Sequence, residues 1–250
     1  MIGVEFKMKA GSKFLQFLSW VILFLLIMSP IILSAGRIRG SGNLVTIEKD
    51  IKDFDQIEIS HSFQVTIKYA KDYSVSVQVD DNLKDYVVIE KHGQCLKIGL
   101  ERGFSCSDPH LAAAITLPDL RQLSLSGASS AQISGFEFSH RLDLDLSGAS
   151  KVEGSLETGD MDLDLSGASS IELGGKGRNL EVHASGASTL NMGEFLVRDA
   201  RLSLSGASNC LVNIAGELDV HASGSSNVKY CGKGTLGSIE ASGCSRIKRI

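Results

Sequence analysis

Apolar and polar residues alternate along most of the chain, in short runs that end at a Ser-Gly motif. The clearest runs precede Ser126, Ser147 and Ser166 and read QLSL, LDLDL and MDLDL. In each run a leucine stands one and three positions before the serine, with a polar residue between the two. Successive side chains of a β-strand point to opposite faces, so this period of two predicts strands that are buried on one face only.

The motif that ends these runs recurs seven times, and the starts of the copies are separated by 21, 19, 19, 20, 18 and 19 residues. The copies are SGAS at 126–129, 147–150, 166–169, 185–188 and 205–208, SGSS at 223–226 and SGCS at 242–245. An apolar residue or cysteine stands five positions after each first serine, which predicts a second short strand after the motif. One unit of about 20 residues cannot bury its apolar side alone. We therefore predict an all-β fold, a parallel β-helix-like solenoid with coils of about 18–21 residues.

The SGAS motif has a structural and a catalytic interpretation. A catalytic nucleophile elbow reads G-x-S-x-G, lies between a strand and a helix, and needs an acid and a histidine downstream. The chain shows neither that order nor a predicted helix, and one catalytic site does not need seven copies. We therefore interpret SGAS as the corner of each coil. Gly127 and its equivalents would supply a backbone conformation that is costly for other residues, and the flanking serines would bond along the stack or to local backbone.

The pattern divides the chain into three parts. Residues 1–36 are set apart as a signal or anchor, residues 40–118 are predicted to form irregular β coils and a cap, and residues 119–250 form the SGAS-repeat solenoid. The stretch DQIEISHSFQVTI resembles a diverged repeat, with Ile57 and Ile59 before Ser60 and Val65 and Ile67 after it. The region 40–118 is therefore expected to continue directly into the solenoid. Open solenoid ends expose strand edges, so we expect capping by the N-terminal strands or by a second chain.

The first 36 residues have the features of an export signal. Three lysines precede an apolar run from Phe14 to Leu33, and small residues follow at Ser34 and Gly36. This order is typical of a secretory signal peptide, but the run is long enough that an uncleaved membrane anchor stays open as an alternative. Both alternatives predict export of the rest of the chain.

Five cysteines lie in the part predicted to be exported. They are Cys95, Cys106, Cys210, Cys231 and Cys244. An odd number cannot be fully paired within one chain. Cys95 and Cys106 could bridge a hairpin, whereas Cys210 and Cys244 are explained as replacements of apolar or small residues in the repeats. None has the CxxC spacing of a zinc site.

Charge and stacking together single out one acidic cluster. The net charge is −4 with acids and bases dispersed, which argues against a nucleic-acid binder. Stacked coils would bring Asp143, Asp145, Asp162 and Asp164 together on one outer sheet face, extended by Glu181 and partly neutralised by Arg201. Carboxylate oxygens are the ligands that Ca²⁺ prefers, so calcium is the one cofactor that the sequence leaves open, against the simpler interpretation of a solvated face.

Two further interpretations of this face are a metal shared by two histidines and a carbohydrate-active enzyme. His183 and His221 would lie two coils and thus about 10 Å apart, too far to share a metal. A carbohydrate-active enzyme would need a carboxylate pair inside a groove, but repeats of 18–21 residues leave little room for an enclosing loop. We therefore predict that the protein is not an enzyme.

The ordered combination of FDQIEIS, FQVTIKY, DDNLKDYV, LKIGL, ITLPDLRQLSLSGAS, the serial SGAS copies and VKYCGKG is similar to the head GIN domain family of auto-transporter adhesins. The resemblance spans residues 40–250. It implies a right-handed parallel β-helix-like solenoid in a secreted or envelope protein, with no established ligand or catalytic residue.

The sequence thus leads to one main functional prediction and two alternatives. The main prediction is an exported, non-enzymatic, adhesin-like interaction module in the periplasm, on the outer surface or secreted. Its partner would be an envelope protein or a glycan, its only membrane contact the N-terminal segment, and homo-oligomers are an open option. The alternatives are a membrane-tethered envelope-stress or signalling ectodomain, which an inner-membrane tether would favour, and a calcium-dependent carbohydrate-active enzyme.

Overall fold

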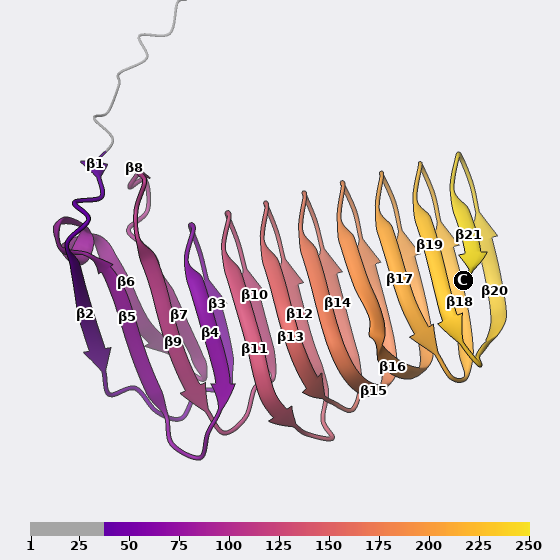
Figure 1. Ribbon diagram of the computed structural model, residues 1–250, viewed down its shortest axis with the longest axis horizontal. Helices are drawn as coiled ribbons and strands as arrows, with labels where there is room; N and C mark the ends of the chain where they lie inside the picture. The colour runs from indigo at the N-terminus through magenta and orange to yellow at the C-terminus, as the bar shows by residue number, and fades with distance from the viewer. Residues whose placement is uncertain (1–37) are drawn as a thin grey trace, which may run out of the picture. The chain divides into compact units, whose positions relative to one another are not determined.

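The computed structural model describes residues 38–250. The predicted signal or anchor lies outside the described residues. Within residues 38–250, no helix is long and apolar enough to cross a membrane. The described chain is built almost entirely from strands, stacked coil upon coil along one axis (Figure 1).

The coils form two facing sheets, which we call sheet I and sheet II. Sheet I contains, in order of pairing, β6 (Val87–His92), β7 (Cys95–Leu100), β3 (Gln56–Ile59), β10 (Gln122–Leu125), β12 (Leu142–Leu146), β14 (Met161–Leu165), the second parts of β15 (Ser170–Ala184) and β16 (Thr189–Leu204), β18 (Glu217–Ala222) and β20 (Thr235–Ala241). Sheet II contains β2 (Leu44–Lys49), β5 (Ser74–Asp80), β9 (Leu111–Leu117), β4 (Gln64–Tyr69), β11 (Ser130–Glu137), β13 (Lys151–Glu157), the first parts of β15 and β16, β17 (Asn209–Ile214), β19 (Asn227–Gly232) and β21 (Arg246–Arg249). The short strands β1 (Ile38–Arg39) and β8 (Cys106–Ser107) pair with each other.

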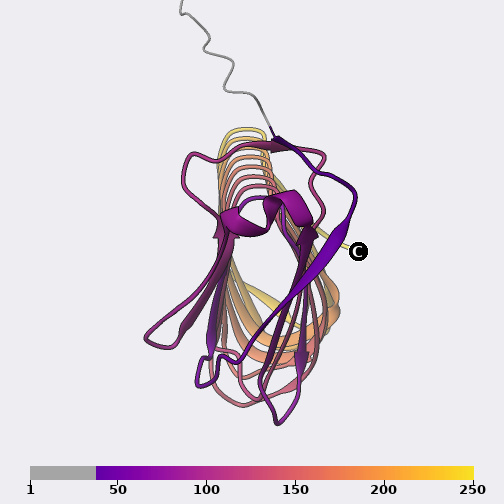
Figure 2. The same cartoon turned by 90° about the vertical axis from the view of Figure 1, so that its left-hand side faces the viewer.

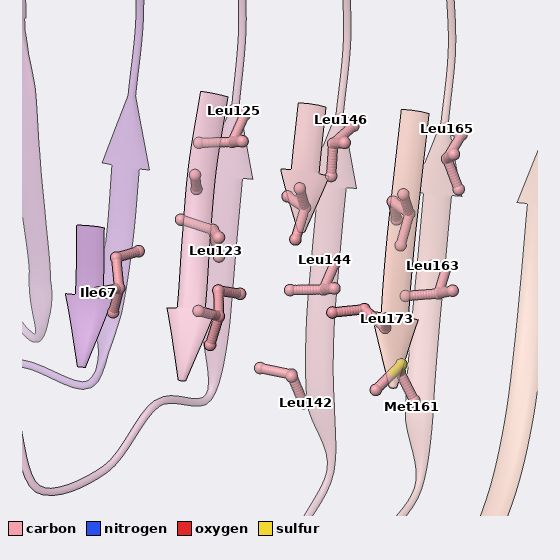
Figure 3. Close-up of a cluster of buried hydrophobic side chains, with 14 of the residues drawn as sticks. Ile67, Leu123, Leu125, Leu142, Leu144, Leu146, Met161, Leu163, Leu165 and Leu173 are labelled. Carbon is pink, nitrogen blue, oxygen red and sulfur yellow. The ribbon is translucent and has the colours of Figure 1, made fainter. Parts of the chain in front are cut away.

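The apolar columns predicted from the alternation form the core between the two sheets. Leu123 pairs with Leu144, and Leu144 pairs with Leu163, each directly above the previous one. All three are fully buried (Figure 3). The polar residues between them point outward on sheet I. The predicted all-β solenoid is therefore confirmed. The apolar side chains of each coil pack against those of the next coil, as a repeat that cannot bury its apolar side alone requires.

Each SGAS motif forms the tight corner that leads from sheet I to sheet II. The amide of Ala149 donates to the carbonyl of Gly127 one coil earlier at 2.7 Å, and the same bond recurs at every later corner. Gly148 has a φ of +76°, and a Cβ added there would lie 2.5 Å from the Gly127 oxygen. Glycine is thus required at this position for two reasons, the left-handed backbone and the close approach of the preceding coil.

The diverged repeat in the N-terminal region stacks in register with the SGAS coils. Ile57 of β3 pairs with Leu123, and Val65 of β4 pairs with Ala131. His61 occupies the position that glycine holds in later corners and has a φ of +72°. Its Nδ1 accepts a hydrogen bond from the Leu100 amide at 3.1 Å.

The N-terminal end of the solenoid is closed by elements that do not belong to the repeat. β2, β5 and β6 pair antiparallel to their neighbours. The 3₁₀ helix η1 (Asp81–Tyr86) lies across the opening between the sheets and buries Leu83 (Figure 2). The buried carboxylate of Asp80 fixes this region by accepting the amides of Gly42 at 2.8 Å and His110 at 2.7 Å.

Candidate binding face and groove

The acidic cluster predicted from the repeats is present on the outer face of sheet I. Asp143 pairs with Asp162, and Asp145 pairs with Asp164, so the four carboxylates lie on two adjacent strands. Glu181 follows Asp162 on the next coil, as predicted. The Asp145 carboxylate also accepts hydrogen bonds from Gln122 at 2.9 Å and Ser124 at 3.1 Å.

The counter-charge of this cluster is Arg141, which the sequence analysis did not identify. The Arg141 guanidinium contacts both Asp143 and Asp162, and Asp162 is the more buried of the two carboxylates. Burial raises the pKa of Asp162 above its usual value, Arg141 opposes that rise, and the neighbouring acidic residues add to it. Arg201, to which partial neutralisation was assigned, follows Glu181 on the next coil and forms its own ion pair with Asp219 at 3.8 Å.

Calcium binding at Asp143, Asp145, Asp162 and Asp164 stays a prediction. Across residues 38–250, no group of three or more His, Cys, Asp or Glu side chains is arranged to hold a metal ion. Two of the four carboxylates already have a guanidinium partner.

A groove with a volume of about 650 Å³ runs along the stack on sheet I, beside the corners. One column of its lining consists of the outward residues two positions before each motif, which are Glu58, Ser124, Asp145, Asp164, His183, Ser203 and His221. The other column consists of the first serines of six corners, which are Ser126, Ser147, Ser166, Ser185, Ser205 and Ser223. Six steps of about 4.8 Å separate the first and last coils of the groove, a span of about 29 Å.

The two serines of each corner have different environments. Ser169, the last serine of its corner, is buried and donates to the carbonyl of Ser166 at 2.7 Å. Ser166, the first serine, is exposed, and its hydroxyl lies 3.4 Å from the Leu146 carbonyl, a long and weak hydrogen bond. The last serines therefore stabilise the corner, whereas the first serines present hydroxyls to the groove at one per coil.

The groove changes in charge along its length. Asp145 and Asp164 lie in its middle, and His183 and His221 lie toward the C-terminal end, two coils apart as predicted. His183 approaches Glu181 at 3.6 Å, and His221 contacts Glu240 at 2.9 Å. One column of the groove thus passes from carboxylates to imidazoles, and the column beside it repeats a serine at each corner.

Two histidine contacts elsewhere look like parts of a catalytic arrangement, and neither is complete. Ser60 lies 2.9 Å from Nδ1 of His61, but that nitrogen also accepts the Leu100 amide, and within residues 38–250 no carboxylate contacts the other ring nitrogen. His140 uses both ring nitrogens, one with Asp119 and one with its neighbour's carbonyl. Sequence spacing gave no signal for the His140–Asp119 pair, because the two residues are 21 positions apart.

The five described cysteines are all free, so the bridge considered between Cys95 and Cys106 does not form in this structure. Burial raises the pKa of Cys210 to about 12 and raises the pKa of Cys95 and Cys106 as well. Such thiols stay protonated and are poor nucleophiles at neutral pH.

Solved structures share this architecture. A putative adhesin from Bacteroides fragilis matches with a TM-score of 0.78 and 20% identity over 85% of this chain and 100% of its own. A putative lipid binding protein from Parabacteroides distasonis matches with a TM-score of 0.70 and 23% identity over 86% of this chain and 99% of its own. A putative adhesin from Parabacteroides merdae matches with a TM-score of 0.67 and 16% identity over 86% of this chain and 99% of its own. At these identities the likeness establishes the fold alone.

No curated protein matches the chain. The sequence model of the family described as "putative auto-transporter adhesin, head GIN domain" matches residues 53–234, from the diverged repeat to the last complete coil but one. The family and the three structures are described as adhesins or as a lipid binding protein, and none of these descriptions names an enzyme. The chain belongs to the head GIN domain family.

Proposed function

We propose that this protein is an exported, non-enzymatic adhesin-like module that binds an extended glycan along the groove of sheet I. The observation that carries the proposal is the line of six first serines, four exposed and two half-buried, beside the outward column that holds the carboxylates and imidazoles. The adhesin-like family supports a cell-surface or exported location.

The geometry of the groove favours a long, repeating ligand. Its column of first serines repeats once per coil, and the groove spans about 29 Å, so a polymer lying along the axis meets a serine hydroxyl at several successive coils. Each contact is weak, but several contacts to one chain act together and raise the overall affinity. Hydroxyls, carboxylates and imidazoles exchange hydrogen bonds with sugar hydroxyls.

The same geometry does not favour catalysis. The groove is open on the outer surface of a flat sheet, and its carboxylates are solvated or bonded to neighbouring side chains. A glycosidase needs a pair of carboxyl groups on either side of an enclosed bond. A surface that binds the polymer without enclosing it is suited to adhesion.

The test is to fill the groove with bulkier side chains. Ser166→Gln and Ser185→Gln place two amides in the middle of the groove, where both serines are exposed. We expect the double variant to lose binding on an array of bacterial surface glycans by about tenfold or more, which corresponds to about 1.4 kcal/mol.

The matched control is Ser170→Gln with Thr189→Gln. These residues lie on the same two coils, but on sheet II, beyond the corner. Equal loss of binding in both double variants would contradict a site in the groove, and so would binding of lipid vesicles but not of glycans by the wild-type chain.

A further inference from the structure

The last coil leaves two strand edges unpaired. β20 pairs only with β18, and β21 pairs only with β19, so within residues 38–250 nothing covers the outer edge of either strand. Leu236 and Ile239 are 44% and 39% exposed, whereas their partners one coil earlier, Leu218 and Val220, are 1% and 2% exposed. An exposed edge with apolar residues is a template for pairing with another chain.

The side chains of the last coil change toward positive charge at this edge. Along one outward column of sheet II, Leu211 is followed by Lys229 and then by Lys248. A second outward column ends in Arg246 after two asparagines, Asn209 and Asn227. Strand β21 therefore reads RIKR and places two cations on its outer face.

The inward column also ends in a charge. Met192 and Val212 are fully buried, Tyr230 is half-buried, and Arg249 takes the same register position on β21. The Arg249 guanidinium donates to the Gly232 carbonyl at 2.6 Å, at the end of the preceding strand. A charge at an inward position of an edge strand opposes pairing, because an added strand would bury it.

Strand β20 is irregular where β18 is regular. Asp219 faces the two residues Gly237 and Ser238, which form a bulge, and the Ser238 amide donates to the Asp219 carboxylate at 2.7 Å. Bulges interrupt the ladder that a new strand would need.

The corner of the last coil adds a further barrier to a second copy. Each corner donates amides to the coil before it and accepts amides from the coil after it. Within the described residues, no donor reaches the carbonyls of Ala241, Gly243 and Ser245. Two such corners meeting face to face would bring acceptor against acceptor.

We propose that the basic strand β21, with Arg249 at its inward position, protects the exposed edge of the last described coil from pairing with a second copy of the chain. This protection goes beyond ligand binding in the groove and rests on different residues. It predicts that the chain does not associate through its C-terminal coil although two strand edges are exposed there.

The test removes the charges and measures association. The variant Arg246→Thr, Lys248→Thr, Arg249→Val keeps β-forming side chains and extends the apolar inward column. The full chain in a mild non-ionic detergent would be followed by light scattering for mass and by hydrogen exchange for location. We expect the triple variant to associate at a concentration about tenfold or more below any association of the wild type, with new protection of amides in residues 235–249.

The control Lys151→Thr, Lys176→Thr, Arg178→Thr removes the same charge from exposed ion pairs in the middle coils and should behave as the wild type. The double variant Arg246→Thr, Lys248→Thr keeps the bond from Arg249 to the Gly232 carbonyl. It replaces the triple variant in the association measurement if the triple variant does not fold. The proposal would be overturned if the folded triple variant, or the double variant in its place, stayed as monomeric as the wild type. The proposal would also be overturned if the variant associated but gained amide protection only outside residues 235–249. Association of the wild type through residues 235–249 would overturn it as well.

Discussion

Leu83 at the N-terminal end of the solenoid is fully buried, whereas Leu236 at the C-terminal end leaves 44% of its surface exposed. The N-terminal end is covered by the antiparallel strands β2, β5 and β6 and by η1, none of which follows the repeat. The last described coil still follows the repeat, but its strand β21 carries charged residues at positions that are apolar or polar in earlier coils. A solenoid end can thus be closed either by covering its edge or by making the edge repellent.

The difference follows from what a parallel stack needs at each end. At the first corner the Ser60 amide donates to the Ile98 carbonyl at 3.0 Å, and the His61 side chain adds a contact that later corners do not have by accepting the Leu100 amide. The last described coil bonds to the coil before it through its corner amides, and its outer edge carries the charges of β21. Covering the first end takes many residues, whereas protecting the last end takes a few charges.

The largest effect should come from a corner glycine in the middle of the stack. In Gly167→Ala the new Cβ would lie 2.5 Å from the Gly148 oxygen, at a φ of +74°. The left-handed backbone costs about 1–2 kcal/mol and the overpacking about 1–3 kcal/mol, so we expect a loss of about 2–5 kcal/mol in the free energy of unfolding. Urea denaturation followed by circular dichroism measures it.

Gly243→Ala is the matched variant in the last corner. Its Cβ would meet the Gly224 oxygen at the same 2.5 Å. Only one coil lies beyond this contact, so that coil can fray and we expect a loss below about 1 kcal/mol. Equal losses for Gly167→Ala and Gly243→Ala would show that the last coil is as firmly held as the middle ones.

The repeat region could be predicted from the sequence because each coil repeats the same alternation of apolar and polar residues and the same corner motif. Leucine alternation and the SGAS spacing were enough to place Leu123, Leu144 and Leu163 in one column and the Asp143–Asp162 and Asp145–Asp164 pairs on one face. The diverged repeat around Ile57 was found for the same reason.

The unique parts could not be predicted in the same way. The Asp80 carboxylate accepts the amides of Gly42 and His110, which are far from it in the sequence. The alternation of apolar and polar residues gives no information about such contacts. Arg141 precedes its strand and reaches Asp162 one coil later, so its role depends on a rotamer. The groove was missed because it arises from two columns together, each of which looked like an ordinary exposed position.

The two leucines at the ends allow a direct test with one kind of substitution. Leu83→Ala leaves a cavity beneath η1 and should cost about 2–4 kcal/mol, since a buried leucine loses both its transfer energy and its packing. Leu236→Ala removes a side chain that already faces solvent and should cost less than about 1 kcal/mol. Thermal unfolding of both variants gives the comparison. A large loss for Leu236→Ala would mean that a further element covers the C-terminal edge in solution.

The smallest expected effect concerns pH and the first corner. Burial lowers the pKa of His61 below its usual value of 6.5, and its Nδ1 accepts the Leu100 amide only when the ring is neutral there. As pH falls below 6.5, the unfolded chain takes up a proton at this histidine before the folded chain does. The free energy of unfolding should therefore fall as pH decreases through this window, and the first corner should loosen before the later ones.

His61→Asn separates this contribution from the other histidines. Asparagine tolerates a positive φ and keeps a side-chain acceptor, so at pH 7.5 the variant should match the wild type within about 0.5 kcal/mol. Between pH 7.5 and 5 the wild type should lose more stability than the variant, because the variant has no proton to take up at this position. Hydrogen exchange at the Leu100 amide reports the same event locally, and its protection should fall with pH in the wild type only. Parallel pH profiles would mean that the first corner is held by its backbone bonds alone, as the later corners are, and that the N-terminal end differs from the rest of the stack in its covering strands and not in its corner.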